Sequence, residues 1–498
     1  MLANIPSATL LGVDGHRVDV EVHVSGGLPG YTVVGLPDAA GRESRERVRA
    51  AMLSSGMAWP QKRMTVNLSP ATVRKSGTGL ELAIALGLLV SESQLPAACL
   101  EGIGVLGELG LDGTIRPVAG TLVLAAALAR DRIETVIVPA ANAHEAALVP
   151  ELRVRIAPNL SILRACLKGE EPWPDVDPPP ISPERMDPDP VDLADVRGLT
   201  TARLALEIAA AGGHHLLLAG PPGCGKTMLA RRLETIMAPL DPDEAVEVTR
   251  IASVCDGEPP SRLASRRPFR APHHSATPAA LVGGGSGRPA PGEVTRAHRG
   301  VLFLDVLGEF PPTALNALRQ PLEEGSVRIA RQGASLVFPA SVLFVACTNP
   351  CPCGRGAMEC RCSDAQKARY TLRLSAPLLD RFDLRQRISG PTAHDPPGED
   401  SAAVAVRVAA AVARQRERFV DTPWRWNREI PASLMERYAG MTRDGLEAWM
   451  LVVEDGMLTG RGAGRVRRVA RTIADLAGAA LVEGEHIVLA ASLRQDVP

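Results

Sequence analysis

Residues 220–227 read GPPGCGKT and have the types and spacing of a phosphate-binding loop. In such a loop the glycines let backbone N–H groups surround the phosphates of a nucleotide, while the lysine and the hydroxyl residue contact the terminal phosphates and Mg²⁺. A mostly apolar run at 215–219 precedes the loop and a helix-like stretch at 228–237 follows it, which is the strand, loop and helix order that the motif requires. We therefore expect a nucleoside triphosphate to be bound by Gly220, Pro221, Pro222, Gly223, Cys224, Gly225, Lys226, Thr227 and Met228.

Two later strand-like runs end in polar side chains that suit the same chemistry. The first ends at Asp305, which we expect to hold Mg²⁺ through water while Thr227 ligates the ion directly. The second leads to Asn349, whose amide would orient the attacking water and sense the γ-phosphate. An asparagine that only caps the turn before Pro350 is the alternative interpretation. Lys226, Asp305 and Asn349 are thus the expected catalytic groups of this site.

Four of the nine cysteines form two C-x-C units separated by six residues: Cys351, Cys353, Cys360 and Cys362. Four thiolates gathered in this way suit tetrahedral zinc, which is the interpretation we favour. The C-x-C spacing is tighter than the common C-x₂-C unit, so a disulfide pair and free thiols stay open as alternatives. A zinc knot over 351–362 would directly follow Asn349 and brace the end of that strand.

The composition limits the location and the class of function. The chain has 498 residues, 45% of them hydrophobic, and a formal net charge of −1. This length suggests about three domains. No apolar run reaches the roughly 18 residues of a membrane span, and the opening residues lack the basic region of a signal peptide, so we expect a cytoplasmic protein. The near-zero charge gives no overall attraction to nucleic acid, and aromatic residues, at 3%, are too few to favour a base-stacking platform.

A stretch rich in proline and acidic residues divides the chain into modules. It has little to bury and predicts an extended linker over about 169–192. Residues 1–168 alternate strand-like and helical runs, which indicates an α/β or α+β domain. Residues 193–390 hold the nucleotide motifs, and residues 391–498 are typical of a helical lid. Glycines and prolines at 269–293 predict an exposed loop inserted into the nucleotide domain.

Further motifs extend on both sides of the phosphate-binding loop. They include DVRGL (195–199), FRAPHHS (269–275), GVLFLD (300–305), NPCPCG (349–354), LLDRFDL (378–384) and RVARTIADL (468–476), and, nearer the N-terminus, VVGLPDAAGRESRERVRAA (33–51), KSGTGLELAIAL (75–86) and GELGLDGTIRPVAG (107–120). Over nearly the whole chain they resemble the magnesium-chelatase-like AAA+ ATPases of the ComM/YifB type. The resemblance implies an α/β fold: an N-terminal Lon-protease-like, S5-type α+β domain, a P-loop AAA+ core with inserted loops, and a C-terminal helical lid.

The resemblance also implies how copies of the chain would share ATP. Members of this family form rings, usually hexamers, with Mg-ATP bound between neighbouring subunits. Arg381, in LLDRFDL, matches the arginine finger that reaches a neighbour's γ-phosphate, with Arg373 as the second candidate. Arg461 falls where the family has a lid arginine that senses the same phosphate. Without the family match, each of these arginines would be interpreted as a solvated helix residue.

One position departs from the family pattern at a point that matters for catalysis. The family has a glutamate directly after Asp305 that positions or deprotonates the attacking water, and this chain has Val306. Loss of a general base removes about 10²–10⁴-fold in rate, so we expect tight ATP binding with slow hydrolysis. Glu309 lies nearby, but the family usually carries an acid there as well. A smaller departure is Leu199, near the adenine pocket, where the family tends to have glutamine.

Two segments of the first domain resemble the catalytic segments of Lon-type proteases, which use a serine–lysine dyad. In the alignment, Gly79 stands at the serine position and Leu122 at the lysine position. Neither residue can act as nucleophile or base, so we expect no peptidase activity. Lys75 and Ser76 are close in sequence, but they stand at the opening turn of their segment and are interpreted as structural.

Arginines in two segments are candidates for contact with DNA: Arg270, Arg288, Arg328 and Arg331. The first two lie in the inserted loop, and the last two in residues 324–332, whose alternation is typical of a hairpin strand. In a ring such segments would line the pore, where arginines neutralise phosphates without regard to sequence. A second arginine cluster lies at 461–471. Ordinary surface charge is the alternative interpretation of both clusters.

By resemblance, the leading function is ATP-driven branch migration or helicase-like remodelling of DNA in recombination or DNA uptake. A protein-remodelling or chelatase-assisting motor is the second hypothesis, since the magnesium-chelatase subunit shares the ATPase core. The third is an ATP-gated scaffold that binds DNA or protein without hydrolysis, which Val306 favours. Apart from further copies of the chain and DNA, the sequence identifies no partner.

Overall fold

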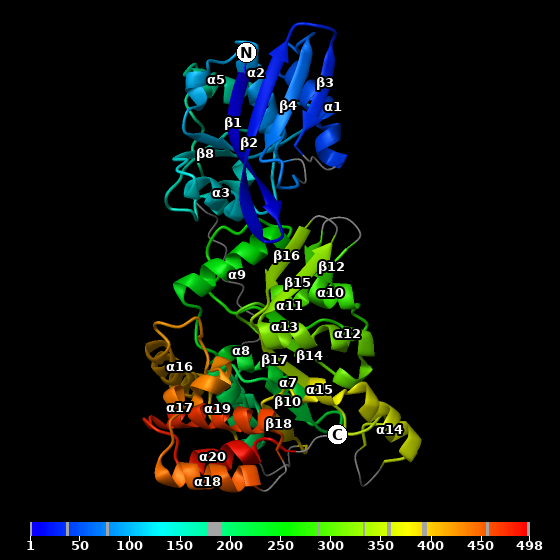
Figure 1. Cartoon of the computed structure of the whole chain (residues 1–498), viewed down its shortest axis with the longest axis vertical. Helices are drawn as coiled ribbons and strands as arrows, with labels where there is room; N and C mark the ends of the chain where they lie inside the picture. Colours follow the sequence, from blue (N-terminus) through cyan, green and yellow to red (C-terminus); the bar gives the residue numbers. More distant parts are fainter. Residues whose placement is uncertain are drawn as a thin grey trace.

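The computed structural model describes residues 2–35, 39–75, 79–177, 191–285, 289–331, 334–355, 360–390, 396–454 and 458–495. Figure 1 shows an elongated molecule, with the first domain at one end and the C-terminal helices at the other. Among the described residues, none of the helices combines the length and the apolar character that a membrane crossing needs.

The first domain packs two larger sheets and the short pair β6 (Glu108–Leu109) and β7 (Ile115–Arg116) against helices. The larger sheet has the order β1 (Leu2–Leu11), β2 (Asp14–Ser25), β4 (Arg63–Ser69) and β3 (Gly30–Val34). Alternate valines of β2 are buried, the period of two expected of a strand with one face on a core, and they pack with α2 (Glu81–Ser91). The smaller sheet consists of β5 (Ile103–Val105), β8 (Thr135–Val138) and β9 (Arg153–Ile156). The remaining long helices are α1 (Ala39–Ser54), α3 (Thr121–Arg130) and α5 (Leu160–Lys168).

The second domain is built on a five-stranded parallel sheet. Its order is β11 (Phe269–Arg270), β14 (Val301–Leu304), β17 (Leu343–Thr348), β10 (Leu216–Ala219) and β18 (Leu384–Arg387). The three central strands are fully buried apolar runs, as expected where helices cover both faces. The flanking helices include α6 (Thr200–Gly212), α7 (Lys226–Arg231), α8 (Leu233–Ile236) and α9 (Pro242–Cys255). The mixed α/β fold expected from the sequence is confirmed.

Short elements interrupt this domain, as the glycines and prolines predict. The described part of the inserted loop holds α10 (Pro278–Val282), β12 (Gly283–Gly284), β13 (Ala290–Pro291) and the start of α11 (Glu293–Arg296). After β14 come α12 (Pro312–Ala317), α13 (Arg319–Glu324) and the hairpin of β15 (Ser326–Arg331) and β16 (Ala334–Pro339). The helices α14 (Asp364–Arg373) and α15 (Ala376–Leu379) lead into β18.

The C-terminal helices share a core with the nucleotide domain. They are α16 (Ser401–Arg418), α17 (Met435–Tyr438), α18 (Arg443–Glu454), α19 (Gly460–Ala477) and α20 (Gly484–Ser492). Buried side chains of α16, α19 and α20 belong to the same hydrophobic cluster as those of α6, β10 and β18. This shared core lets the C-terminal helices reach the sheet directly.

The two domains also contact each other beyond the connecting segment. The helices α3 and α9 pack together, and the buried carboxylate of Glu145 accepts hydrogen bonds from Leu122 N–H (3.0 Å) and from the Ser253 hydroxyl of α9. Phe338 of β16 lies against Gly12 in the turn between β1 and β2, as the proximity of the two regions in Figure 1 suggests. The first domain thus rests on the hairpin of the second.

Part of the predicted linker packs rather than extending freely. Trp173 lies against the core of the first domain, with the Arg155 guanidinium 5.6 Å from the centre of its ring. Residues 178–190 lie outside the described residues. The domain boundaries at 168, 192 and 390 stay predictions.

Candidate nucleotide-binding site

The phosphate-binding loop leaves the carboxyl end of β10 and leads into α7. Gly223 and Gly225 have φ values of 79° and 90°, the left-handed region that favours glycine. A side chain at either position would be strained, which explains the glycines of the motif. Gly220 N–H donates to the carbonyl of Thr348 (3.1 Å), so the loop begins beside the end of β17.

Three other predicted residues surround this loop. Met228 Cε and Leu199 Cδ1 lie 3.6 and 3.8 Å from the position that a Cβ on Gly225 would occupy, so both side chains lie beside the phosphate-binding loop. Cys224 is buried, and its sulfur lies 3.7 Å from Lys226 Nζ, so this cysteine supports the loop from inside the protein.

Lys226 and Asn349 face the same point at the edge of the sheet. The lysine is 7% exposed, and its ammonium donates to the carbonyls of Gly220 (2.8 Å) and Pro221 (2.7 Å). Asn349 Oδ1 lies 3.4 Å from the same Nζ. The side chains of Lys226, at the start of α7, and Asn349, just after β17, thus converge and are placed to contact one terminal phosphate.

Thr227 and Asp305 form the other half of the site. Thr227 Oγ1 donates to Asp305 Oδ2 at 3.0 Å, although the two residues belong to different strand–helix units. A hydroxyl and a carboxylate are hard oxygen ligands of the kind that Mg²⁺ prefers. These residues therefore fit a magnesium ion, with Thr227 as direct ligand and Asp305 beside it.

Val306 occupies a backbone conformation that suits few side chains. Its φ and ψ are 52° and 59°, and its N–H donates to Asp305 Oδ1 (3.0 Å). The left-handed region costs an L-residue about 1–2 kcal/mol, and the clash is worse for a β-branched side chain. The chain thus keeps a strained turn at the position of the family's glutamate without the carboxylate.

The next acidic residue along the chain is Glu309. It is exposed, and it lies close enough to Tyr370 on α14 to add to the rise in the pKa of that phenol, which burial mainly causes. The Tyr370 hydroxyl lies 3.1 Å from Thr348 Oγ1, and Arg373 Nη1 lies 3.4 Å from the carbonyl of Gly308. Sequence analysis missed Tyr370, because a single tyrosine in a polar helix gives no pattern.

The four clustered cysteines come together beside the phosphate loop. The sulfurs of Cys351 and Cys353 are 3.3 Å apart, those of Cys351 and Cys360 are 3.6 Å apart, and all four, with Cys362, lie within 4.8 Å of one another. A tetrahedral zinc with Zn–S bonds of about 2.3 Å requires sulfurs about 3.8 Å apart. Backbone N–H groups of Arg355 and Arg361 lower the pKa of Cys353 to about 6, whereas burial raises the pKa of the neighbouring Cys362 to about 11, so these two thiols differ in how readily they form the thiolate that a metal needs.

The cysteine cluster also touches the nucleotide loop. Gly354 has a φ of 74°, and a Cβ at this position would meet Pro222 Cγ at 2.7 Å. Glycine therefore allows the turn of the cysteine cluster to pack directly against Pro222 of the loop.

Arg381 lies at the opposite edge of the sheet. Because β10 and β18 run parallel, with Leu216 beside Leu384, the residues just before β18 lie at the amino end of β10. The phosphate loop leaves the other end, about 13 Å away at 3.3 Å per residue. The Arg381 guanidinium is 11% exposed and pairs with Glu323 on α13, which is itself 57% exposed. Arg381 therefore faces away from the nucleotide loop of its own chain.

Arg461 lies on the same side of the sheet as Arg381. It lines a cavity of about 730 Å³ together with Arg385 and Arg494, and with residues of α15, α18 and α20. Cavities of this size accept small anionic or nucleotide ligands. The two predicted phosphate-sensing arginines thus share one face, while Arg373 stays beside the Asp305 turn of its own chain.

The predicted DNA-contacting arginines differ in their surroundings. Arg270 makes a two-bonded ion pair with Glu293 (2.8 and 3.0 Å), so its charge is already neutralised. Arg328 on the hairpin is 66% exposed, with Glu324 at 3.7 Å. Arg288 and the side chain of Arg331 lie outside the described residues. Arg328 is therefore the candidate that the described part of the chain leaves best exposed.

The structure corrects the interpretation of the C-terminal arginine cluster as a surface that binds phosphate. Arg467 and Arg471 are buried, at 6% and 2% exposure, and donate to backbone carbonyls and to Glu436 and Asp475 respectively. Arg468 donates to a backbone carbonyl in the same way. The interpretation of Arg467 and Arg471 as part of a phosphate-binding surface is wrong, because the packing of α19 turns both side chains inward.

Comparison with known proteins agrees with this geometry. The family models magnesium chelatase, subunit ChlI (residues 192–395), subunit ChlI of Mg-chelatase (20–142) and magnesium chelatase, subunit ChlI C-terminal (398–494) match the chain. The YifB protein of Salmonella typhimurium is 40% identical over 99% of this chain and 97% of its own. The competence protein ComM of Haemophilus influenzae is 37% identical over 100% of this chain and 98% of its own. The chain belongs to the ComM/YifB family of magnesium-chelatase-like AAA+ proteins.

Membership of this family confirms the resemblance found in the sequence. The sheet of the second domain has the order β11-β14-β17-β10-β18, and the phosphate loop follows β10. Family membership identifies this sheet as that of a chelatase-like AAA+ ATPase core. The assignment of individual residues to catalysis, metal or DNA is not tested by these comparisons and stays a prediction.

Part of this chelatase-like protein also matches a protease. Lon protease 2 of Bacillus subtilis is 32% identical over 28% of this chain. Gly79 packs against Val118, and Leu122 is 3% exposed, so the two dyad positions hold no reactive group. Lys75 donates to the carbonyl of Pro70, while Ser76 lies outside the described residues.

Proposed function

We propose that this protein binds Mg-ATP between adjoining copies of the chain in a ring, usually a hexamer, and hydrolyses it slowly. One observation carries the proposal: Lys226, Thr227, Asp305 and Asn349 lie at one edge of the sheet and Arg381 lies at the other. A single chain therefore cannot close the site around a γ-phosphate, whereas a neighbour that presents its opposite edge supplies the missing guanidinium.

The ring is proposed to act on DNA, by branch migration or helicase-like remodelling in recombination or DNA uptake. Support comes from the relative named competence protein ComM and from the exposed Arg328 on the hairpin. An exposed arginine neutralises phosphate and gives binding that weakens with salt and ignores base sequence. A cytoplasmic location stays a prediction.

The test is ATP turnover with and without DNA. We expect branched or single-stranded DNA to raise turnover, and Arg328→Ala to reduce this stimulation and to make it more sensitive to salt. Arg443→Ala is the matched control, because Arg443 is also an exposed arginine paired with a glutamate four residues away. Stimulation by a protein partner but not by DNA would select a chelatase-like remodelling function instead.

Val306 favours one other function. A site that binds Mg-ATP without a base beside Asp305 can serve as an ATP-gated scaffold for DNA or protein. Nucleotide binding with no γ-phosphate release in a single-turnover assay, with or without DNA, would select this scaffold over the motor.

The cysteine cluster is proposed to hold one zinc ion through Cys351, Cys353, Cys360 and Cys362. The sulfur separations fit a tetrahedral site, and all four thiols come from one short segment, as in structural zinc sites. Zinc would stiffen the segment after Asn349 and, through Gly354, the phosphate loop.

A further inference from the structure

The turn that carries Arg381 is held by an arginine of α19. Arg465 donates from Nη1 to the carbonyl of Arg381 (3.1 Å) and to Asp383 Oδ1 (2.7 Å). The two acceptors lie on either side of one peptide turn, so this guanidinium fixes the backbone from which the Arg381 side chain extends.

A second arginine holds the same turn from just beyond α20. Arg494 donates to the carbonyls of Phe382 and Asp383 and, at 3.2 Å, to Asp380 Oδ1. Its side chain is 5% exposed. Arg465 on α19 and Arg494 just after α20 thus clamp residues 380–383 from the C-terminal region.

Asp383 connects this turn to the strand that ends in the phosphate loop. Its second oxygen accepts the N–H of His215 (3.0 Å), and its own N–H donates to the His215 carbonyl (3.0 Å). Burial alone would raise the pKa of Asp383, but His214 and Arg465 hold that pKa well below its ordinary value. The carboxylate is therefore charged, and β10 runs from this joint straight to Gly220.

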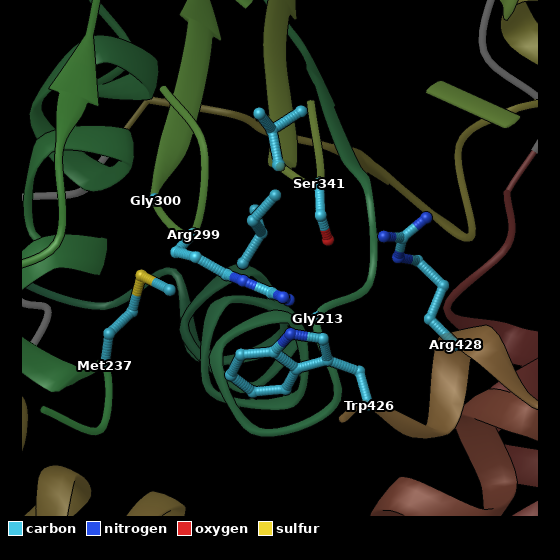
Figure 2. A pocket seen from close by; sticks show the side chains of 9 residues that line it. Gly213, Met237, Arg299, Gly300, Ser341, Trp426 and Arg428 are labelled. Atoms are coloured by element: carbon cyan, nitrogen blue, oxygen red, sulfur yellow. The ribbon is translucent and has the colours of Figure 1, made fainter. Parts of the chain in front are cut away.

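Side chains also pack closely around His215, next to its contact with Asp383. Figure 2 shows Arg299, Trp426 and Arg428 around a cavity at the amino ends of the strands, and that cavity has about 10 Å³ for a water-sized molecule. This is room for a single water, so the cavity is a packing feature rather than a ligand site. Arg428 lies 3.2 Å from His215 Nε2, and Phe344 N–H donates to His215 Nδ1 (3.0 Å), which holds the imidazole on both sides.

The contacts of Arg465 are with the Arg381 turn. Its side chain is 20% exposed, and among the described residues its guanidinium donates to the Arg381 carbonyl and to Asp383 Oδ1. The side chain of Arg381, by contrast, donates to the Pro377 carbonyl and to the exposed carboxylate of Glu323. It is 11% exposed, so it must leave Glu323 to reach the phosphate of an adjoining copy.

We propose that Arg465 and Arg494 are positioning residues, which set the direction in which Arg381 is offered to the nucleoside triphosphate of the adjoining copy. Asp383 and β10 tie this direction to the phosphate loop of the same chain. This inference rests on the proposed function, in which ATP is shared between copies.

The test uses mixtures of two full-length variants. Lys226→Ala removes the nucleotide site but keeps Arg381 as donor, and Arg381→Ala keeps the site but lacks the donor. Each alone should lose at least about 10³-fold in single-turnover γ-phosphate release, and the mixture should recover part of it, because some interfaces pair an intact site with an intact arginine. No recovery in the mixture would overturn the shared site itself.

Arg465→Ala is then combined either with Lys226→Ala, the arginine donor, or with Arg381→Ala, the partner with the intact nucleotide site. Added to the Lys226→Ala donor, it should lower the rate in the mixture about 10-fold with unchanged apparent KM for ATP, because the arginine is misdirected while the site is intact. Added to the Arg381→Ala partner, it should have no effect on that rate. Equal loss in both placements, or no loss in either, would overturn the positioning role.

The two placements contain the same substitution, so a general loss of stability affects both equally. If Arg465→Ala does not fold, Arg465→Lys provides the second variant, since it keeps a positive charge against Asp383 but lacks the planar guanidinium. We expect Arg465→Lys in the donor to retain more of the rate than Arg465→Ala, and in the partner to change nothing. Equal effects of Arg465→Lys in the two placements would contradict the proposal as well.

Discussion

Thr227 Oγ1 lies 3.0 Å from Asp305 Oδ2, although the two residues are 78 positions apart in the sequence. This hydrogen bond holds the hydroxyl and the carboxylate of the proposed magnesium site side by side. Two oxygen ligands so placed suit one Mg²⁺ ion. The position next to Asp305 holds Val306, which cannot act as a base. In the proposed function, an arginine of an adjoining copy supplies the positive charge on the other side of the γ-phosphate.

The missing base gives the first prediction. Val306→Glu is expected to raise ATP turnover by about 10²-fold, because it restores a carboxylate that accepts the proton of the attacking water. Val306→Gln is the matched control, since it removes the β-branch and has nearly the shape of glutamate but cannot act as a base. Steady-state phosphate release measures both, and equal rates for the two variants would contradict the explanation.

The backbone at the same position gives a prediction about stability. Val306→Asn should raise the melting temperature of the nucleotide-free protein by roughly 2 °C, because asparagine tolerates the left-handed conformation at a φ of 52° better than valine. Val306→Ile keeps the β-branch and should give no increase. A melting temperature for Val306→Asn at or below that of the parent would show that the turn stores no strain.

Metal analysis tests the cysteine cluster. The purified protein should contain one zinc per chain, and Cys353→Ser or Cys360→Ser should release it, because three sulfurs hold zinc less tightly than four. Cys99→Ser, outside the cluster, should leave the zinc content unchanged. A metal-free parent that titrates as fewer than nine thiols after denaturation would instead support a disulfide.

A carboxylate at the amino edge of the sheet gives a prediction about pH. Glu247 on α9 accepts hydrogen bonds from His298 (3.0 Å) and Arg299 (2.6 Å), and these groups, with His298 the larger cause, lower its pKa to about 2 from an ordinary 4.5. The ionised carboxylate therefore adds stability that is complete above pH 4.5 and is lost as the pH falls from 4.5 towards 2.

Glu247→Gln should accordingly destabilise the protein by about 1 kcal/mol at pH 7, a discounted value because the Glu247 side chain is 35% exposed. Melting curves between pH 7 and pH 3 should show the difference from the parent shrinking below pH 4.5. The exposed Glu258→Gln should show no such trend. A difference that stays constant with pH would mean that the stabilisation is not ionic.

The sequence predicts well the parts of this site that depend on local pattern. Gly223, Gly225, Lys226 and Thr227 lie in one loop whose backbone demands fix the residue types, and a strand that ends at Asp305 must place that carboxylate at the same edge of a parallel sheet. The strand predicted at 301–304 is the β14 of the structure.

Other features depend on contacts between distant elements and could not be predicted. Arg467 and Arg471 resemble a basic surface in the sequence, but the packing of α19 turns them inward to Glu436 and Asp475. The clamp of Arg465 on Asp383 joins residues 82 positions apart, and no periodicity encodes such a pair. The ion pair of Arg270 with Glu293 is likewise visible only once the inserted loop is folded.

The central claim is that the loop at 220–227 and Asp305 hold Mg-ATP. Equilibrium binding of a fluorescent ATP analogue to the parent, Lys226→Ala and Asn349→Ala, with and without Mg²⁺, tests it most directly. The account predicts micromolar or tighter binding that depends on Mg²⁺, at least about 100-fold weaker binding for Lys226→Ala, and retained binding with slower hydrolysis for Asn349→Ala. Equal affinity of the parent and Lys226→Ala, or no binding by the parent, would contradict it.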